Sequence, residues 1–262
     1  MNMIVCVKQV PDSYTVRLDP VTNTIQREQA KSILNPFDLF AVEEAVRLKS
    51  RFGGHITAIS MGIPAASAAL REAMAMGVDD GVLLSDRCFA GADTIATGCA
   101  LKHGIRRQGS FDLIVCGRMA TDGDTAQLPP ILAELLHIPC LTDVCEVISC
   151  EDGVLRCRRM GDDGYGIWEC ALPALITVTK ECNVPRLASI AGLRYAHGRP
   201  VTTWTAEDLP DLDRSLVGLR GSATQVKRTF VPQNSTSIQM LKGGAAQQAR
   251  DLTERLCERR II

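Results

Sequence analysis

The stretch from Leu113 to Leu136 constrains the fold more than any other part of the chain. It consists of a short apolar run that stops at Gly117, a loop of small and polar residues, and apolar residues at helical spacing from Leu128 onward. A short apolar run is typical of a buried parallel strand, and the two consecutive prolines after Leu128 fit only the first turn of a helix. The stretch therefore predicts a strand–loop–helix unit in an α/β protein.

The loop of this unit has the features of a phosphate-binding site. Backbone N–H groups at the start of a helix attract anions, so we expect those of residues 123–128 and the hydroxyl of Thr125 to bind a nucleotide phosphate. Asp122 and Asp124 have the wrong charge, and we expect them to accept hydrogen bonds from ribose hydroxyls or from the loop backbone. The local pattern alone fits an ordinary capped helix equally well, because strand–loop–helix units are common and do not fix function.

Composition excludes several classes of function. The 262 residues carry 29 basic and 30 acidic side chains without a basic stripe interleaved with aromatics, so nucleic acid is not an expected partner. No apolar run approaches the ~20 residues of a membrane span and the chain opens on a strand pattern, so we expect a cytoplasmic protein without a signal peptide. The eleven cysteines form no Cys-x-x-Cys pair, which argues against a metal site; we expect Cys6, Cys116 and Cys140 to be buried as small apolar residues.

The first half of the chain alternates strand and helix patterns. Strands are expected at residues 3–7, 55–61, 81–84 and 112–116, and helices at 36–49, 64–76 and 93–107. This order predicts a doubly wound, mostly parallel, Rossmann-like sheet, in which Asn35 and Pro36 cap and start the first helix. Ligands of such sheets bind beyond the carboxyl ends of the strands, so residues 8–12, 61–63 and 117–127 should form one crevice.

The pattern changes after residue 139. Strands expected at 141–149, 154–160, 165–170 and 174–179, with turns at 151–153 and 161–164, predict an antiparallel edge of the sheet, with Trp168 in the core or an interface. From residue 180 to 228 the periodicity fades into an extended segment with short helical pieces, which is typical of partner binding. A helix pattern returns at 237–262. We therefore predict an α/β nucleotide-binding domain at 1–180, an extended segment at 181–230, and a C-terminal arm at 231–262; the alternative is that this arm folds back on its own domain.

Four motifs connect the chain to a known family. Lys8-Gln9-Val10-Pro11-Asp12, Asn35-Pro36-Phe37-Asp38, Asp122-Gly123-Asp124-Thr125-Ala126-Gln127 and Lys180-Glu181-Cys182-Asn183-Val184-Pro185-Arg186 stand in the order and spacing of electron-transfer flavoprotein β subunits. The chain resembles these subunits over essentially its full length. The resemblance implies assembly with a homologous α subunit that carries a mobile FAD domain, with the C-terminal arm of this chain packing on it. It also implies a nucleotide in the crevice, either FAD or a structural AMP.

The resemblance and the expected crevice together select the cofactor-binding residues. These are Lys8, Val10, Pro11, Asp12, Asn35, Met61, Gly62, Gly117, Arg118, Asp122, Gly123, Asp124, Thr125, Ala126 and Gln127. Arg118 could stabilise a reduced anionic flavin or remain a solvated surface residue. No catalytic residue is expected, because the isoalloxazine ring of a flavin performs the redox chemistry.

Several stretches resemble the flavin-bifurcating branch of the family more than the AMP-binding branch. These are residues 122–127, 204–209, 216–222 and 226–228. This likeness implies FAD in this chain, NADH as electron donor, and ferredoxin or flavodoxin as a low-potential acceptor. The other electron would pass through the α-subunit flavin to a flavin dehydrogenase such as an acyl-CoA dehydrogenase. The alternative is a structural AMP-binding subunit, because Leu128-Pro129-Pro130 replaces the family's Val-Gly-Pro and removes one possible N–H donor.

Residues 185–195 resemble the family's recognition loop for the partner dehydrogenase. The matching residues are Pro185, Arg186 and Ile190, with Ile190 at the position of the apolar anchor. Burying an isoleucine side chain in a partner pocket contributes ~1.5–3 kcal/mol, and packing of Ile190 inside its own chain is the alternative. A third function, a free-standing nucleotide sensor or hydrolase, lacks support because the chain has no Gly-x-x-x-x-Gly-Lys-Ser/Thr loop and no convincing nucleophile–base pair.

Overall fold

The computed structural model describes residues 1–12, 32–227 and 238–262. Contacts within the chain divide it into two units, Met1–Lys227 and Arg228–Ile262. The domain boundaries expected at residues 180 and 230 stay predictions.

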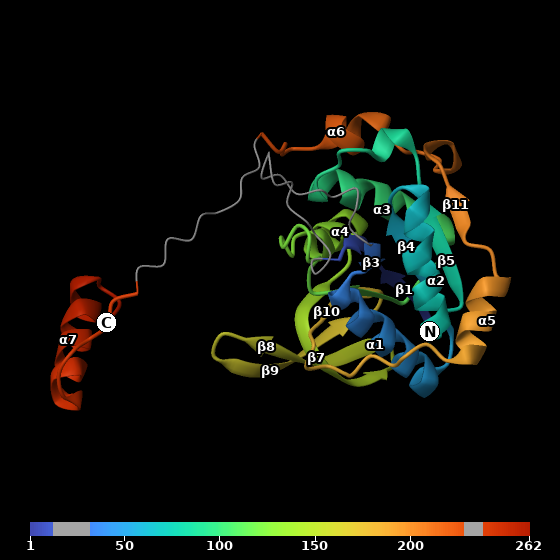
Figure 1. The fold of residues 1–262 in the computed structure, drawn as a ribbon. Helices are drawn as coiled ribbons and strands as arrows, with labels where there is room; N and C mark the ends of the chain where they lie inside the picture. The colour runs from blue at the N-terminus through green and yellow to red at the C-terminus, as the bar shows by residue number, and fades with distance from the viewer. Residues whose placement is uncertain (13–31, 228–237) are drawn as a thin grey trace. The chain divides into compact units, whose positions relative to one another are not determined.

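The first unit is organised around one mixed sheet (Figure 1). Among the described residues the strand order is β11-β5-β4-β1-β6-β10-β7-β8-β9. The strands are β1 (Asn2–Cys6), β4 (His55–Met61), β5 (Asp80–Leu84), β6 (Leu113–Gly117), β7 (Cys140–Glu151), β8 (Val154–Gly161), β9 (Gly164–Ala171), β10 (Ala174–Val178) and β11 (Thr202–Trp204). Neighbours from β11 to β7 pair in parallel, whereas β8 pairs antiparallel with both β7 and β9. The α/β class and the mostly parallel sheet with an antiparallel edge are confirmed.

Helices cover both faces of the parallel part of this sheet (Figure 1). The helices α1 (Pro36–Phe52) and α2 (Ser67–Met76) pack on one face, and α3 (Thr94–Gln108) and α4 (Leu128–Leu136) pack on the other. Alternate residues of β1 enter the two cores: Val5 packs with α1 and α2, while Ile4 packs with α3 and α4. Strands that are buried on both faces require the continuous apolar runs seen in the sequence.

Shorter elements complete the first unit. They are β2 (Gln9–Pro11) paired antiparallel with β3 (Ser32–Leu34), the 3₁₀ turns η2 (Pro64–Ala66), η3 (Arg87–Phe89), η4 (Ala206–Asp208) and η5 (Arg214–Leu216), and the helices α5 (Ile190–Gly198) and α6 (Gly218–Gly221). The extended segment therefore contains the two short helices α5 and α6 and also a strand, β11, which pairs with β5. The sequence did not predict β11, because three residues are too few for a periodic signal.

The predicted position of one strand in the sheet was wrong. Residues 174–179 were expected in the antiparallel edge, but β10 lies inside the sheet and pairs in parallel with β6 and β7. Every residue of β10 is buried, which is the pattern of an interior parallel strand and not of an edge.

The hairpin turn at 151–153 is confirmed, with Asp152 and Gly153 at positive φ.

Two expectations about single side chains need correction. Trp168 is half-exposed and lies against the Arg159 guanidinium at 5.5 Å, so it is not a core residue; a role in an interface stays a prediction. Cys6 and Cys116 are buried as expected, whereas Cys140 is only partly buried. Burial still raises the pKa of the Cys140 thiol to about 11.

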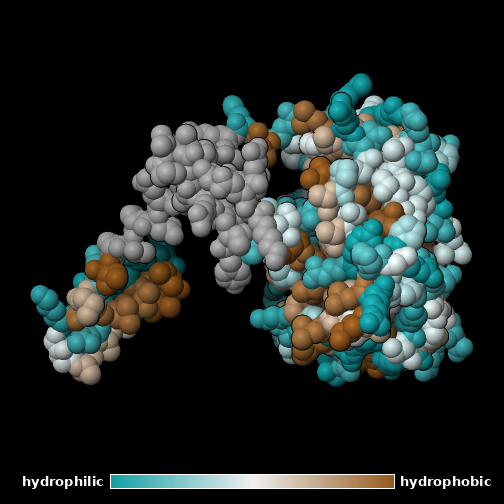
Figure 2. Space-filling view, turned by 45° about the vertical axis from the view of Figure 1, so that its right-hand side comes forward, coloured by the Kyte–Doolittle hydropathy of each residue, from teal (hydrophilic) through white to brown (hydrophobic). Residues whose placement is uncertain are grey.

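The second unit contains the helix α7 (Ala245–Glu258). The helix expected from residue 237 begins only after Gly243 and Gly244, which weaken a helix start; residues 228–237 lie outside the described part. Apolar side chains gather on the surface of this unit (Figure 2), and the exposed ones are Ile238, Met240, Leu252, Ile261 and Ile262. Within the described ranges no helix has the length and apolar character needed to cross a membrane.

Candidate functional site

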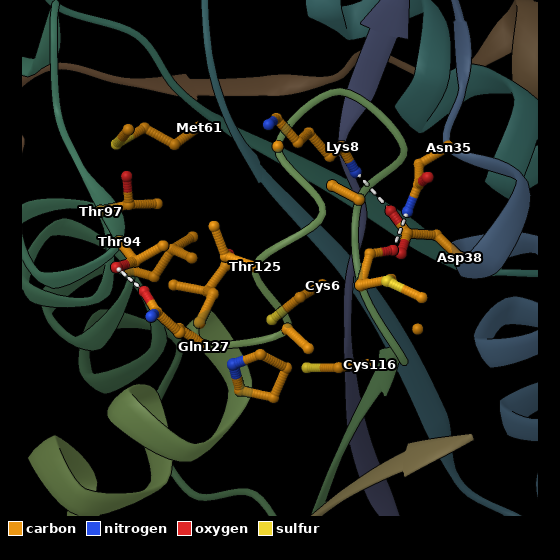
Figure 3. A pocket seen from close by; sticks show the side chains of 18 of the residues that line it. Cys6, Lys8, Asn35, Asp38, Met61, Thr94, Thr97, Cys116, Thr125 and Gln127 are labelled. Carbon is orange, nitrogen blue, oxygen red and sulfur yellow. Dashed lines mark hydrogen bonds between the residues drawn. The ribbon is translucent and has the colours of Figure 1, made fainter. Parts of the chain in front are cut away.

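A cavity of about 330 Å³ opens at the carboxyl ends of β1, β4 and β6 (Figure 3). Nine of the predicted cofactor-binding residues line it: Lys8, Asn35, Met61, Gly117, Gly123, Asp124, Thr125, Ala126 and Gln127. The three segments expected to form one crevice are thus brought together by the parallel sheet, as ligand sites in such sheets usually are. Six predicted residues do not line this cavity: Val10, Pro11, Asp12, Gly62, Arg118 and Asp122.

The loop before α4 presents backbone donors to the cavity. The N–H groups of Gly123 and Asp124 already bond to the Ala120 carbonyl. Those of Thr125, Ala126 and Gln127 have no acceptor among the described residues. Three consecutive N–H groups at a helix start form a concave anion site, so Thr125–Gln127 are the candidate phosphate donors.

The shape of this loop depends on two unusual backbone conformations. Asp124 and Ala126 adopt positive φ angles of 52° and 53°. The left-handed region costs a residue with a Cβ roughly 1 kcal/mol or more, and alanine lacks the side-chain oxygen that eases this conformation for aspartate. Such strain persists only where the surrounding structure imposes it, which is consistent with a binding loop.

The first turn of α1 joins two loops of the cavity. Asn35 is the N-cap residue of α1, as expected, but its side chain makes no capping hydrogen bond. It donates from Nδ2 to the Met119 carbonyl at 2.9 Å and accepts the Thr121 N–H at 3.3 Å. Its backbone N–H donates to the Lys8 carbonyl at 2.9 Å. Asn35 therefore fixes the loop after β6 to the loop after β1, and it contributes to the cavity by shaping these two loops.

Asp38 is a buried carboxyl group in the wall of the cavity. The sequence analysis named Asp38 only as part of a family motif and did not predict it as a site residue. Its Oδ2 accepts the Lys8 backbone N–H at 2.8 Å, as Figure 3 shows. Burial raises the pKa of Asp38 to about 7, against the opposing effects of the hydrogen bonds from Lys8 and Asn35. The strand β6 approaches closely here, because a Cβ added at Gly117 would overlap the Asp38 carboxylate and the Phe37 carbonyl.

The start of α3 forms the opposite wall of the cavity and was missed by the sequence analysis. Asp93 caps this helix by accepting the N–H groups of Ile95 and Ala96 at 3.0 Å, and its other oxygen holds Thr224. Thr94 donates from its hydroxyl to Gln127 Oε1 at 3.1 Å, which connects the starts of α3 and α4 across the cavity (Figure 3). The remaining missed residues of the lining are Cys6, Val7, Ile59, Ala92, Thr97, Leu101, Cys116 and Pro129, whereas Met119, Ala120 and Leu128 fall within the segments expected here.

Three of the predicted charged residues of the site, Lys8, Arg118 and Asp122, are engaged in ion pairs. Lys8 Nζ lies 2.7 Å from Asp122 Oδ1, and both side chains are partly exposed. Arg118 Nε lies 3.0 Å from Asp143 Oδ1, outside the lining of the cavity. These pairs tie the loop after β6 to its neighbours, and Arg118 binds β7 and not the cavity.

The Cys116 thiol in the cavity is not suited to nucleophilic catalysis. The pKa of the Cys116 thiol is raised well above its usual value, first by its hydrogen bond with Cys6 and then by burial, so the reactive thiolate is suppressed. No group of three or more His, Cys, Asp or Glu side chains that could hold a metal ion occurs within residues 1–12, 32–227 and 238–262. The arrangement is suited to binding and orienting a ligand.

The predicted recognition segment is anchored on the second and third turns of α1. Arg186 donates from Nε and Nη2 to the two oxygens of Glu43, at 2.7 and 2.9 Å. Burial alone would raise the pKa of Glu43, but the hydrogen bonds from Arg186 outweigh it and hold the pKa below its usual value. Ile190 begins α5 and is 74% exposed, so it does not pack inside the described part of its own chain.

Comparisons with known proteins identify the family. The model of the electron transfer flavoprotein domain matches residues 22–209. The chain belongs to the electron transfer flavoprotein family, among its β subunits. It is 46% identical, over the whole of both chains, to the electron transfer flavoprotein subunit beta of Thermoanaerobacterium thermosaccharolyticum. It is also 43% identical to the caffeyl-CoA reductase-Etf complex subunit CarD of Acetobacterium woodii, and 39% identical to the acryloyl-CoA reductase electron transfer subunit gamma of Anaerotignum propionicum, again over the whole of both chains.

Proposed function

We propose that this β subunit binds FAD in its cavity and passes electrons from NADH toward the flavin of an α subunit, in the cytoplasm. One electron would go to a low-potential acceptor such as ferredoxin or flavodoxin. The other would reach a flavin dehydrogenase such as an acyl-CoA dehydrogenase. Two relatives whose names include CoA-ester reductases support a partner of this kind.

The observation that carries the proposal is the set of backbone donors at Thr125–Gln127. These three N–H groups have no acceptor among the described residues, and they line the cavity together with the Thr125 hydroxyl. They fit the pyrophosphate of FAD, because helix starts bind anions through such groups. Apolar side chains of the lining, including Met61 and Leu101, provide a surface for a flat ring.

FAD, when bound, supplies hydride and one-electron chemistry. The residues of this chain bind and orient the ligand. The Asn35 side chain keeps the loop that carries the N–H donors in place, and the Thr94–Gln127 hydrogen bond fixes the opposite wall. The predicted contacts of Val10, Pro11, Asp12, Gly62, Arg118 and Asp122 would require FAD to extend beyond the cavity.

A structural AMP is the second candidate, and the size of the cavity favours it. A volume of about 330 Å³ lies near the lower end of the ~300–1,000 Å³ typical of small-molecule sites. It suits one nucleotide better than the two joined halves of FAD. The same N–H donors would then bind the AMP phosphate, and this chain would act as a scaffold for the flavin of its partner.

We further propose that Pro185, Arg186 and Ile190 belong to a recognition segment for the partner dehydrogenase. Arg186 would hold the segment on α1, while the exposed Ile190 side chain would enter a partner pocket. The arm at 231–262 would pack on the α subunit, and its exposed apolar residues support this role. Deletion of residues 231–262 should abolish co-elution with the α subunit on size exclusion, and a truncated chain that still co-elutes would contradict this role.

The deciding experiment is to coexpress the chain with its α subunit, denature the purified complex, and quantify FAD and AMP per heterodimer by chromatography. Two FAD and no AMP would support the flavin-binding function and justify a test of reduction by NADH. One FAD and one AMP would overturn it in favour of the scaffold. The variant Thr125→Val removes one donor hydroxyl and retains the backbone N–H groups, so it should lower occupancy without abolishing it.

A further inference from the structure

Asp38 joins three parts of the nucleotide cavity. Its carboxylate binds the Lys8 backbone N–H, it lies at the start of α1 beside Asn35, and it abuts Gly117 at the end of β6. It also lines the cavity, so a ligand would lie close to it (Figure 3). Asp38 is therefore a buried ionisable group that the redox function does not use.

The charged and titratable groups around Asp38 come from each neighbouring element. The Lys8 ammonium group favours the ionised form of Asp38, and the Asp122 carboxylate disfavours it. Lys8 Nζ contacts both oxygens of Asp122, at 2.7 and 2.8 Å, so part of its charge is already neutralised. The Cys116 thiol on β6 also interacts electrostatically with Asp38, and it remains protonated because its pKa is raised well above its usual value.

We propose that Asp38 takes up a proton from solvent when a nucleotide enters the cavity, so that the affinity for nucleotide falls as the pH rises through neutrality. This inference rests on the nucleotide-binding function proposed above. A phosphate held at Thr125–Gln127 would share one poorly solvated cavity with Asp38, so its negative charge would disfavour the ionised form of the Asp38 carboxyl group. Protonation of one Asp38 oxygen removes this repulsion, and no bond to the ligand forms or breaks.

Two features of Asp38 make it suitable for this role. Its pKa of about 7, raised by burial, means that a small change in local charge shifts its protonation at physiological pH. Its hydrogen bond to Lys8 needs only one acceptor oxygen, which a protonated carboxyl group still provides. Asp38 can thus change charge while the Lys8 loop stays in place, and it acts as a positioning residue in both states.

The test is calorimetric titration of the full chain, freed of nucleotide, with FAD and with AMP between pH 6 and pH 8. A bound nucleotide that raises the pKa of Asp38 by one unit changes the dissociation constant by at most about tenfold. Between pH 6 and pH 8 the dissociation constant of the wild type should therefore rise about fivefold relative to that of Asp38→Asn. Titrations at pH 7 in two buffers of different ionisation enthalpy should detect proton uptake by the wild type and none by Asp38→Asn. AMP titrates itself near pH 6, but this effect is common to both proteins and cancels.

A matched control tests whether the pH dependence is specific to Asp38. His137 ends α4 with a positive φ of 59°, a conformation that asparagine tolerates well. The variant His137→Asn should keep the pH dependence of the wild type. If His137→Asn abolishes that dependence, or if Asp38→Asn retains it, the role of Asp38 is refuted while nucleotide binding stands.

Two further outcomes are decisive. If neither FAD nor AMP binds the wild type at any pH, the proposed function fails and the role of Asp38 fails with it. If Asp38→Asn does not fold, infrared difference spectra of the wild type should show a protonated carboxyl band that grows on nucleotide addition at pH 7. A spectrum without that band would overturn the inference.

Discussion

Helix α1 carries buried acids at two places, and burial has opposite outcomes there. In the first turn, Asp38 lies without a cation in direct contact with its carboxylate among the described residues, and burial raises its pKa to about 7. One turn further on, Glu43 is also buried, but the bidentate Arg186 lowers its pKa. A directly bonded cation therefore reverses the effect of burial. Asp38, at the cavity end of α1, can therefore change charge near neutral pH, whereas Glu43, which holds the recognition segment, stays ionised.

The largest effect is expected from Gly117→Ala, which would displace Asp38. The added Cβ would overlap the Asp38 carboxylate and the Phe37 carbonyl, and backbone cannot move aside as a flexible side chain can. We expect a loss of about 3 kcal/mol in the free energy of unfolding, measured by denaturant titration. Gly123→Ala, in the loop that follows β6 and with nothing within 4 Å of the new Cβ, is the control and should cost less than about 0.5 kcal/mol.

Asp38→Asn should alter how stability depends on pH. The folded-state pKa of about 7 lies above the unfolded value of 3.8, so the folded state binds more protons between these values. Asp38 therefore destabilises the wild type increasingly as the pH rises through this window. The unfolding free energy of Asp38→Asn minus that of the wild type should increase by about 2–3 kcal/mol from pH 5 to pH 8. If this difference in unfolding free energy does not change with pH, Asp38 and Glu43 do not respond to burial in opposite ways.

Arg186→Ala should lower the free energy of unfolding by a somewhat smaller amount, and the pH dependence of this change should be opposite to that expected for Asp38. It leaves Glu43, which is 7% exposed, without its main cationic partner, and we expect a loss of about 2 kcal/mol at pH 7. This value is below the range for fully buried pairs, because the Arg186 side chain is 43% exposed. The pair stabilises the fold above the unfolded pKa of Glu43, 4.5, and loses its effect as the pH falls through the lower folded-state pKa.

The double variant Glu43→Gln/Arg186→Ala provides the control for this pair. It removes the unpaired charge, so it should recover part of the stability that Arg186→Ala loses. Equal losses for the single and double variants, measured at pH 7, would mean that the salt bridge is not what holds the recognition segment on α1.

The smallest effect is expected for the exposed pair of Lys8 and Asp122. The two side chains are 48% and 32% exposed, and surface ion pairs contribute little. Asp122→Asn should change the free energy of unfolding by less than about 0.5 kcal/mol. A larger change by thermal denaturation would show that this pair, and not Asp38, holds the Lys8 loop.

The sequence predicted most of the scaffold because local patterns determine it. Apolar runs located β1, β4, β5 and β6, and the loop composition located the start of α4. The position of β10 in the sheet was not predictable in this way, because strand order depends on contacts between segments far apart in the chain.

The candidate site was predicted only in part, because some of its residues belong to one local motif and others come from distant segments of the chain. The Thr125–Gln127 loop is a local feature, but Thr94 and Asp93 enter the cavity only because α3 packs beside α4. The sequence could have drawn attention to Asp93 as the cap residue before a helix pattern. The behaviour of Asp38 depends on its burial by other segments, which no local pattern reports.

The two edges of the main sheet are protected to different degrees. At one edge β11 has only three residues, and a short edge strand offers few groups for pairing. At the other edge β9 has eight residues and exposes Tyr165, Ile167 and Trp168. A long edge with apolar side chains is a template for strand addition. At high concentration the isolated chain should therefore aggregate through β9, and charged substitutions there should improve its solubility.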